Sequence, residues 1–449
     1  MVKMYVFLNH FDEVHVRPMA MTNVKSPVQA TASAPRSTNK SALAMMTTLF
    51  FMWGFLTVLN DILVPHLKAI FDLNYFKVML IQFAFFSSYF VFALPWGKVI
   101  DWIGYQKTMV AGLLTMALGA VLFIPAASVP SFPLFLGALI VLACGMTALQ
   151  VAANPYVAVL GPPETASSRL NLAQAFNSLG TTIGPYLGGL LILSVATKSG
   201  EEMQQMSAGA LQLYRQQQAS SVKLPYLIFG AVLLLLSIAI GRFKLPAMAE
   251  ATHKTHTGEK EASLWQYRHL VLGAVAIFTY VGAEVAIGSF LINYLTQHSI
   301  GNISELTASR YVSYYWGGAM VGRFVGSAIL QKVKTSTVLG TAAIVACLLV
   351  TTSMLTYGQA AVWSIILVGL FNSIMFPSIF TMGIEKLGPR TGDGSGVLIM
   401  AIVGGAIIPV VQGAIADQVG IHHAFFLPAI CYLYIVYYAF KGSRPVVPA

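Results

Sequence analysis

The amino-acid sequence predicts an all-α membrane protein with twelve transmembrane helices in two pseudo-symmetric six-helix bundles. The first observation is composition: of 449 residues, 57% are hydrophobic and only 9% are charged, which is too apolar for a soluble globule of this length. The second is a succession of apolar runs of about 20 residues, the length that crosses a hydrocarbon core of roughly 30 Å. The third is an internal repeat of sequence landmarks.

The apolar runs follow one another along most of the chain and define the expected spans. Because their number is even, both termini are expected on the same side of the membrane. Between the fifth and sixth spans, the run Gly200–Gln218 is expected to form a short surface helix. The spans are placed near 43–67, 77–100, 108–127, 132–158, 169–194, 225–242, 267–296, 308–331, 336–357, 361–386, 394–416 and 422–440.

The distribution of Lys and Arg over the loops predicts the orientation. With the N-terminus in the cytoplasm, 20 of the 26 basic residues fall in the tails and cytoplasmic loops, as the positive-inside rule requires. Both termini are therefore expected to be cytoplasmic. The net charge of +10 follows from this bias and indicates no nucleic-acid partner.

Composition also predicts how the chain divides. Pro, Ser, Thr, Ala and Lys dominate from Ser26 to Lys40, which is typical of a disordered tail. We expect the natural start at Met19 or Met21. A charged stretch near the middle of the chain indicates a linker. The expected parts are a disordered cytoplasmic tail (1–41), an N-terminal bundle (42–242), a cytoplasmic linker (243–265), a C-terminal bundle (266–441) and a cytoplasmic tail (442–449).

The two halves share landmarks at offsets of 222 to 225 residues, which indicates a parallel repeat. Each pair alone is weak, but their common order across four helix pairs favours two equivalent bundles. The pairs are Asp61 and Glu284, Pro155 and Pro377, Gly161 and Gly383, Gly180 and Gly404, Pro185 and Pro409, and Gly97-Lys98 and Gly322-Arg323.

Two acidic residues, Asp61 and Glu284, lie deep within membrane-length apolar runs. A carboxyl at that depth costs roughly 2.5 to 3.5 kcal/mol on insertion scales, so it usually has a function. Three interpretations stay open for such a group: a structural carboxyl held neutral by burial, a proton carrier, or an oxygen ligand of a bound cation. We favour a role in cation coupling for both residues.

A cluster of amide side chains occupies the fourth and fifth spans. Gln150 and Asn154 belong to the fourth, and Gln174 and Asn177 lie three residues apart on one face of the fifth. Facing lipid, these groups would leave donors and acceptors unsatisfied, so we expect them to line an interior cavity and bind substrate. The alternative is that the amides only join helices to one another.

Aromatic residues in the spans are candidate platforms for a sugar ring, which presents apolar C–H faces and a rim of hydroxyls. Tyr89 and Trp316 are the candidates we assign to the binding site. Because aromatic residues make up 12% of the chain, lipid contact or core packing is the alternative for any one of them.

Other functional classes lack support in the sequence. The three cysteines all fall within predicted spans and form no disulfide or metal-binding pattern. No phosphate-binding loop, metal-ligand spacing or nucleophile triad indicates an enzyme, a metal site or a bound cofactor. A sugar sensor would need an output domain, and neither the tail nor the linker is long enough to fold one.

Several strings carry a resemblance to a known family. One follows the second span, GKVIDWIGYQK at 97–107; the others are FMWGFLTVLNDILVPHLK at 51–68, LQVAANPYVAVLG at 149–161, ETASSRLNLAQAFNSLG at 164–180, SLWQYRHLVLGAVAIFTYVGAEVAIGSF at 263–290 and WGGAMVGRFVG at 316–326. With two six-helix halves, the chain resembles the major facilitator superfamily from about Leu43 to Phe440. Within it, the strings are most similar to the fucose permease branch and its bacterial glucose/galactose transporters.

The resemblance implies sugar uptake by alternating access, with a cation moving alongside the sugar. In fucose permeases, an acid in the first span and a Glu in the fourth carry proton and sugar functions; Asp61 matches the first, whereas Gln150 stands at the second and cannot titrate. Glu284, which matches the glucose/galactose-like members, is expected to replace it. By the same matching, Gln82 and Asn177 resemble sugar-contacting positions.

Two further substrate candidates, Asn293 and Asn372, are added from their location in the seventh and tenth spans. Gating residues are expected at the cytoplasmic ends of the second and eighth spans, where glycines allow close approach of helices. They are Gly97, Lys98, Asp101, Gly322 and Arg323.

The leading hypothesis is a monomeric hexose symporter of the bacterial inner membrane that takes glucose or galactose, with H⁺ or Na⁺ as the co-transported ion. N-acetylglucosamine and fucose remain alternative sugars. A drug/proton exporter of the same fold is a further alternative, and the amide cluster weighs against it because such exporters have larger, more apolar cavities.

Overall fold

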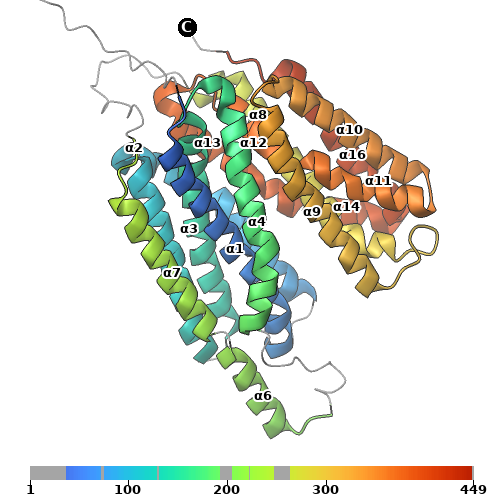
Figure 1. Ribbon diagram of the computed structural model, residues 1–449. Coiled ribbons are helices and arrows are strands. Elements are labelled where there is room, and N and C mark those ends of the chain that lie inside the picture. The colour runs from blue at the N-terminus through green and yellow to red at the C-terminus, as the bar shows by residue number, and fades with distance from the viewer. Residues whose placement is uncertain are drawn as a thin grey trace, which may run out of the picture. The chain divides into compact units, whose positions relative to one another are not determined.

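Helices and short turns, with no strand, account for the part of the chain that the computed structural model describes (Figure 1). This part comprises 37–71, 75–128, 131–192, 205–221, 223–246 and 263–446. Within it, the side chains at 56–71, 75–80, 82, 127, 185–192, 208, 215, 216 and 218–221 are not described. The helices are α1 (Lys40–Phe71), α2 (Tyr75–Ser128), α3 (Phe132–Val159), α4 (Ala166–Ile192), α6 (Ala208–Ser221), α7 (Lys223–Arg242), α8 (Arg268–Leu295), α9 (Glu305–Ile329), α10 (Thr335–Leu355), α11 (Gly358–Asn372), α12 (Met375–Gly383), α13 (Thr391–Met400), α14 (Gly404–Val419), α15 (Ile421–Ala424) and α16 (Phe426–Tyr437).

These helices confirm the predicted all-α class and coincide with the twelve predicted spans. The second and third spans are the two parts of α2, the tenth is α11 with α12, the eleventh is α13 with α14, and the twelfth is α15 with α16 and the π-helical turn Tyr438–Gly442. Among the described residues, eight helical stretches are long and apolar enough to cross a membrane. The longest, Phe83–Ala126, holds two of the predicted spans.

Two glycines mark reversals of the chain that other residues would resist. Gly104, with φ 79° and ψ 167°, interrupts α2 between its two spans, and Gly420, with φ 83°, follows the end of α14. Both have positive φ, which glycine adopts without the clash that a Cβ would cause. Each therefore allows the chain to turn back between consecutive spans.

Consecutive spans run in opposite directions, as hydrogen bonds between distant segments show. The backbone N–H of Asn39, just before α1, donates to the carbonyl of Leu160, just after α3, at 3.1 Å. The Tyr156 hydroxyl, near the end of α3, donates to the carbonyl of Pro246, just after α7, at 2.9 Å. The start of α1 and the ends of α3 and α7 thus lie at the same end of the helices.

The helices pack mainly within two groups. In the first, α1 packs against α4, and α2 packs against α3 and α7; in the second, α8 packs against α14 and α16, and α11 against α9 and α10. Contacts between the groups include those of α4 with α9 and α12, and those of α2 and α3 with α13. Residues 1–36 of the predicted tail and 247–262 of the predicted linker lie outside the described residues, so the proposed domain boundaries remain predictions.

The predicted short helix between the fifth and sixth spans is present as α6, which begins at Ala208 rather than at Gly200. Positions 200–204 lie outside the described residues.

Glycines at equivalent positions of the repeat bring helices into close contact in both groups. A Cβ added at Gly180 of α4 would overlap the backbone carbonyl oxygen of Phe51 in α1. A Cβ added at Gly404, its repeat partner, would overlap the carbonyl oxygen of Phe278 in α8. Small residues permit this approach, which lets helices associate through packing in lipid.

Substitution Gly180→Ala is expected to destabilise the protein by about 1 to 3 kcal/mol, because overpacking of a tight contact costs that much. The added Cβ would also lie 2.8 Å from the backbone nitrogen of Phe55. A fall in the thermal unfolding midpoint in detergent would show the effect.

The matched control is Gly137→Ala on α3, where a new Cβ would meet no atom within 4 Å. That variant should unfold at the same temperature or higher, because Ala favours the helix over Gly by about 1 kcal/mol. Equal midpoints for Gly180→Ala and wild type would contradict the packing argument.

Candidate functional site

A cavity of about 160 Å³ lies between the two groups of helices and holds the candidate site. It is large enough for several water-sized groups. Six of the eleven lining residues come from the second group of helices and one from the turn between α13 and α14. The lining consists of Trp53, Gln150, Gln174, Asn177, Tyr280, Val281, Glu284, Arg323, Phe376, Pro377 and Ile402.

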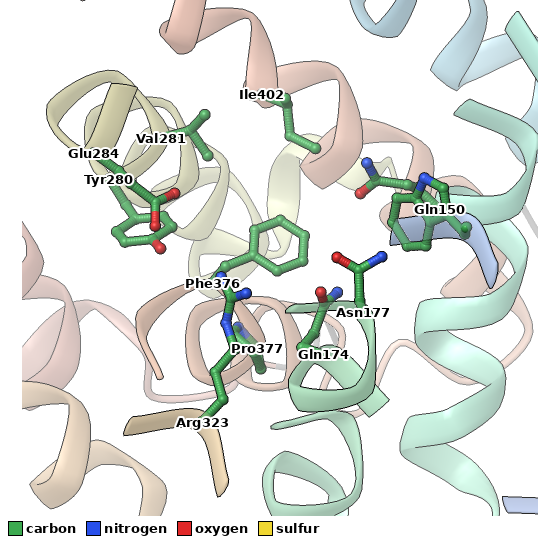
Figure 2. A pocket seen from close by; sticks show the side chains of 11 residues that line it. Gln150, Gln174, Asn177, Tyr280, Val281, Glu284, Arg323, Phe376, Pro377 and Ile402 are labelled. Atoms are coloured by element: carbon green, nitrogen blue, oxygen red, sulfur yellow. The ribbon is translucent and has the colours of Figure 1, made fainter. Parts of the chain in front are cut away.

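One wall of the cavity is formed by the amides of Gln150, Gln174 and Asn177. The Gln150 amide nitrogen donates to the Tyr89 hydroxyl at 3.1 Å, and the Asn177 amide nitrogen donates to the carbonyl of Phe50 at 2.9 Å. In Gln150 and Asn177, the amide nitrogen is thus held by a hydrogen bond, which leaves the carbonyl oxygen available to accept another. The three side chains lie together on one side of the cavity in Figure 2.

The opposite wall carries the acidic group. Glu284 and Tyr280 lie one helical turn apart on α8 and point into the cavity from the same side (Figure 2). The Tyr280 hydroxyl and the Glu284 Oε1 atom are both buried; the two side chains interact with each other, and within the described part of the chain neither atom is hydrogen-bonded to a third residue. A buried carboxyl beside a single hydroxyl keeps unused hydrogen-bonding capacity, which a ligand or an ion can satisfy.

Arg323 adds a positive charge to the cavity. Its Nε donates to the carbonyl of Ser373 at 3.3 Å, and one terminal nitrogen donates to the Ser178 hydroxyl on α4. Its charge interacts with Glu284, but the two side chains form no direct ion pair within the described residues. Arg323, which we expect to act at a cytoplasmic gate, has its side chain in the lining of the cavity. Its gating role remains a prediction.

An apolar surface completes the cavity. Phe376 is 9% exposed and Trp53 is 7% exposed, and Val281 and Ile402 add aliphatic contacts. Phe376 stacks on Phe380 with ring centroids 5.9 Å apart, which holds its ring in place. In Figure 2 the Phe376 ring lies between the amide wall and the acidic wall.

Prolines prepare two of the carbonyl groups near the cavity. Pro155 and Pro377 have no N–H to donate to the carbonyl four residues earlier, so the carbonyls of Val151 and Ser373 lose their helical partners. The Ser395 hydroxyl donates to the Val151 carbonyl at 2.7 Å, and Arg323 donates to the Ser373 carbonyl. Two positions related by the repeat therefore supply acceptors to side chains from other helices.

Five predicted substrate residues do not line the cavity. Tyr89 and Asn154 are buried behind the amide wall, where Asn154 accepts a long hydrogen bond of 3.5 Å from Gln174. Asn372 is fully buried; it donates to the Tyr315 hydroxyl at 2.9 Å and accepts from the Tyr432 hydroxyl at 2.8 Å, which uses its hydrogen-bonding groups.

The other two lie nearer the surface. Asn293 is exposed near the end of α8, and Trp316 is 43% exposed and packs beside Gly288.

The backbones of Asp61 and Gln82 belong to α1 and α2, but their side chains lie outside the described residues. Their expected roles remain predictions.

At the end of the helices where α1 begins, hydroxyl side chains join the two groups. We call Ser167, Ser168, Ser327, Thr335 and Thr381 the hydroxyl cluster. The Ser167 hydroxyl lies 2.5 Å from that of Thr381 and accepts from Thr335 at 3.0 Å. Ser168 and Ser327 each donate to the backbone carbonyl of the other, at 2.7 and 3.0 Å. The cluster links α4 to α9, α10 and α12.

The remaining predicted gating residues lie near this end. A Cβ at Gly97 would come within 3.1 Å of the carbonyl oxygen of Gly392, so this glycine permits contact between α2 and α13. Lys98 and Asp101 are exposed beside it. Gly322 instead packs within its own group, where a Cβ would overlap the carbonyl oxygen of Leu370.

Sequence reasoning missed several residues of this region. Trp53, Tyr280, Phe376 and Ile402 line the cavity without having been singled out, although Tyr280 lies one turn from Glu284 and was accessible to a search for neighbours on the same helical face.

Arg169, at the start of the fifth predicted span, was not singled out, yet it is only 4% exposed. It donates to the carbonyls of Val157, Pro162 and Gly161, which satisfies groups at the end of α3.

Comparison with known proteins adds the family. The family model described as Major Facilitator Superfamily matches residues 41–402. The chain is 51% identical over 403 residues to the "Glucose/galactose transporter" of Brucella abortus biovar 1 (strain 9-941), covering 90% of this chain and 94% of that protein. It is 37% identical over 406 residues to the "L-fucose-proton symporter" of Escherichia coli (strain K12), covering 88% and 92%.

A solved structure agrees in fold. The crystal structure of "a Major Facilitator Superfamily (MFS) transporter, FucP, in the outward conformation" superposes with a TM-score of 0.83 at 36% identity, covering 88% of this chain and 97% of that one. The protein belongs to the major facilitator superfamily.

Proposed function

We propose that the protein is a secondary active transporter that imports a hexose, with glucose or galactose as the expected sugar, by cation-coupled symport. The observation that carries the proposal is the cavity between the two groups of helices, which combines an amide wall, an aromatic ring and a buried carboxyl. The similarity to a protein named glucose/galactose transporter supports the choice of sugar.

The chemistry of the cavity suits a sugar. The amide oxygens of Gln150, Gln174 and Asn177 can accept hydrogen bonds from sugar hydroxyls, whose directions distinguish one hexose from another. The ring of Phe376 offers a flat apolar surface to the C–H face of the sugar, and Tyr280 supplies a hydroxyl. Every one of these groups comes from a single chain, so a monomer suffices.

The coupling role is proposed for Glu284 together with Asp61. The buried Glu284 carboxyl lines the cavity beside the Tyr280 hydroxyl, and a proton or a cation would neutralise its charge there. We propose the proton as the ion, because the relative in Escherichia coli is named a proton symporter. Sodium is the alternative, since the same carboxyl and the nearby amide oxygens are hard ligands.

The hydroxyl cluster supports alternating access. With both termini cytoplasmic, as the Lys and Arg distribution predicts, the end that holds the cluster faces the cytoplasm. The contacts of Ser167 and Ser168 then close the cytoplasmic side, and the cavity is reached from outside. The similarity to a structure in the outward conformation supports this assignment. The setting is the bacterial inner membrane.

Purified protein in liposomes should accumulate labelled glucose under an inward proton gradient, and an inward sodium gradient should have no effect. Asp61→Asn should abolish glucose accumulation, because an Asn side chain cannot carry a proton. Glucose counterflow should stay partly intact. Uptake driven by sodium alone would replace the ion, and concentrative uptake by Asp61→Asn at the wild-type level would remove that residue from coupling.

Removal of the amide wall should weaken sugar binding. Gln150→Ala and Asn177→Ala should each raise the glucose Kd about 10-fold, since each loses a hydrogen bond of about 0.5 to 1.5 kcal/mol and leaves a polar partner unsatisfied. Isothermal titration in detergent gives the Kd. Gln212→Ala, on the exposed face of α6, is the control. Unchanged binding in both cavity variants would leave the amides as helix–helix contacts.

The ring of Phe376 should contribute to affinity through its flat face. Phe376→Leu keeps an apolar side chain and should raise the glucose Kd about 5-fold, in line with roughly 1 kcal/mol for an aromatic contact. Phe380→Leu is the matched control, because Phe380 is buried and stacked on Phe376 but does not line the cavity. Equal losses in the two variants would indicate a packing effect rather than a contact with sugar.

A further inference from the structure

Arg323 lines the cavity, and its side chain is hydrogen-bonded in both groups of helices at once. It belongs to α9, it donates to the Ser373 carbonyl between α11 and α12, and it donates to the Ser178 hydroxyl on α4. Four residues further along α9, Ser327 makes the α4 contact of the hydroxyl cluster. We call the α4–α9 contact formed by Ser168, Ser327, Ser178 and Arg323 the seam. Arg323 and Ser178 extend this contact from the hydroxyl cluster to the cavity.

Both partners of Arg323 are prepared to accept. The Ser373 carbonyl lacks a helical partner because Pro377 has no N–H to donate. The Ser178 hydroxyl donates its one proton to the carbonyl of Gln174 at 3.1 Å. Toward Arg323, its oxygen can therefore act only as an acceptor. Neither partner is charged, and the guanidinium is therefore held by hydrogen bonds alone.

Glu284 is the competing partner. Its carboxyl lines the same cavity and interacts electrostatically with Arg323, yet the two form no ion pair in this conformation. The other described titratable groups that interact with Glu284 are Tyr280 on its own helix, Tyr315 on α9 and Tyr432 on α16. Of these groups, only Arg323 carries a positive charge.

We propose that Arg323 makes symport obligatory: it holds α9 to α4 through Ser178 when Glu284 is protonated and no sugar is bound, and it leaves Ser178 in the empty and the fully loaded states. This inference rests on the proposed proton-coupled sugar transport. It assigns to the Arg323–Ser178 contact the task of preventing movement of the proton-only carrier.

The three states follow from the strengths of the competing bonds. A charged carboxylate is a better partner than a hydroxyl, because charge-assisted hydrogen bonds are roughly twice as strong as neutral ones. The empty carrier, with Glu284 ionised, therefore draws Arg323 to Glu284 and frees the seam. Protonation from the aqueous side converts the carboxylate to a neutral carboxyl, and Arg323 returns to Ser178.

Bound sugar then breaks the Arg323–Ser178 contact, as the ionised Glu284 does in the empty carrier. Its hydroxyls enter the cavity that Arg323 lines and accept hydrogen bonds from the guanidinium in place of Ser178. Reorientation is thus permitted for the empty and the fully loaded carrier and blocked for the carrier that holds only a proton. Strict coupling of proton and sugar requires that the empty and the fully loaded carrier can reorient and that the proton-only carrier cannot.

The first test is sugar-free proton flux into liposomes that contain a pH-sensitive dye, under an inward proton gradient. Ser178→Ala and Arg323→Gln should each raise this flux about 10-fold or more, since a hydrogen bond to a charged group stabilises its contact by a factor of that order. Ser88→Ala is the control, because Ser88 is equally buried but donates only within its own helix, to Ala84. Exchange of labelled for unlabelled D-glucose should persist in Ser178→Ala, because exchange uses only loaded states.

The second test is genetic interaction between the two sites. Glu284→Gln stays neutral, so Arg323 should remain on Ser178 in the empty carrier; net downhill glucose uptake should stop while exchange continues. Adding Ser178→Ala to Glu284→Gln should restore net downhill uptake. A merely structural role for Ser178 would make the double variant worse than either single variant.

The outcomes separate this inference from the proposed function. A leak in Arg323→Gln but not in Ser178→Ala, or no leak in either, overturns the inference while wild-type glucose uptake upholds the function. Loss of glucose exchange in Ser178→Ala also overturns it, because Ser178 would then be needed for binding. Wild-type protein that moves no glucose under any gradient overturns the proposed function, whatever the leak shows.

Discussion

The rest of the structure depends on one constraint, which is that hydrocarbon leaves no water to satisfy a polar group. Backbone groups meet it by forming helices, and the exceptions are found where a side chain takes over. The Val151 and Ser373 carbonyls, freed by prolines, accept from Ser395 and Arg323. At the end of α3, Arg169 likewise donates hydrogen bonds to several backbone carbonyls. Polar side chains are therefore concentrated at the cavity and at the helix ends.

The repeat uses one device twice and gives it different tasks. Pro155 and Pro377 occupy equivalent positions, and each frees the carbonyl four residues before it. In the first half, that carbonyl accepts from Ser395, which belongs to the other group of helices. In the second half, it holds Arg323, which belongs to the same group and donates through a terminal nitrogen to Ser178 of the first group. Equivalent backbone geometry thus carries both a fixed contact and one that the charge of Glu284 can compete for.

The sequence predicted the spans and the amide wall because both follow from periodicity and from the cost of polar groups in lipid. It did not predict that Asn372 would be enclosed by Tyr315 and Tyr432, since a hydrogen bond between separate helices depends on how each is rotated. For a related reason it did not predict that the Arg323 side chain would line the cavity, since where a long side chain ends depends on the partners that other helices offer it. With 12% aromatic residues, the pattern also could not distinguish Phe376 from the rings that only pack.

A transporter has to break its closing contacts in every cycle, and this limits how strong they can be. The hydroxyl cluster meets the limit because a neutral hydrogen bond contributes only about 0.5 to 1.5 kcal/mol, so a few of them favour one conformation by a few kcal/mol without trapping it. An equilibrium of that size is reversed by a ligand with a differential affinity of about 5.5 kcal/mol or less. Within such a balance, the added bond from Arg323 to Ser178 is enough to decide the preferred state. A single carboxyl in the cavity can then control a contact between helices, because the seam it acts on is already close to balance.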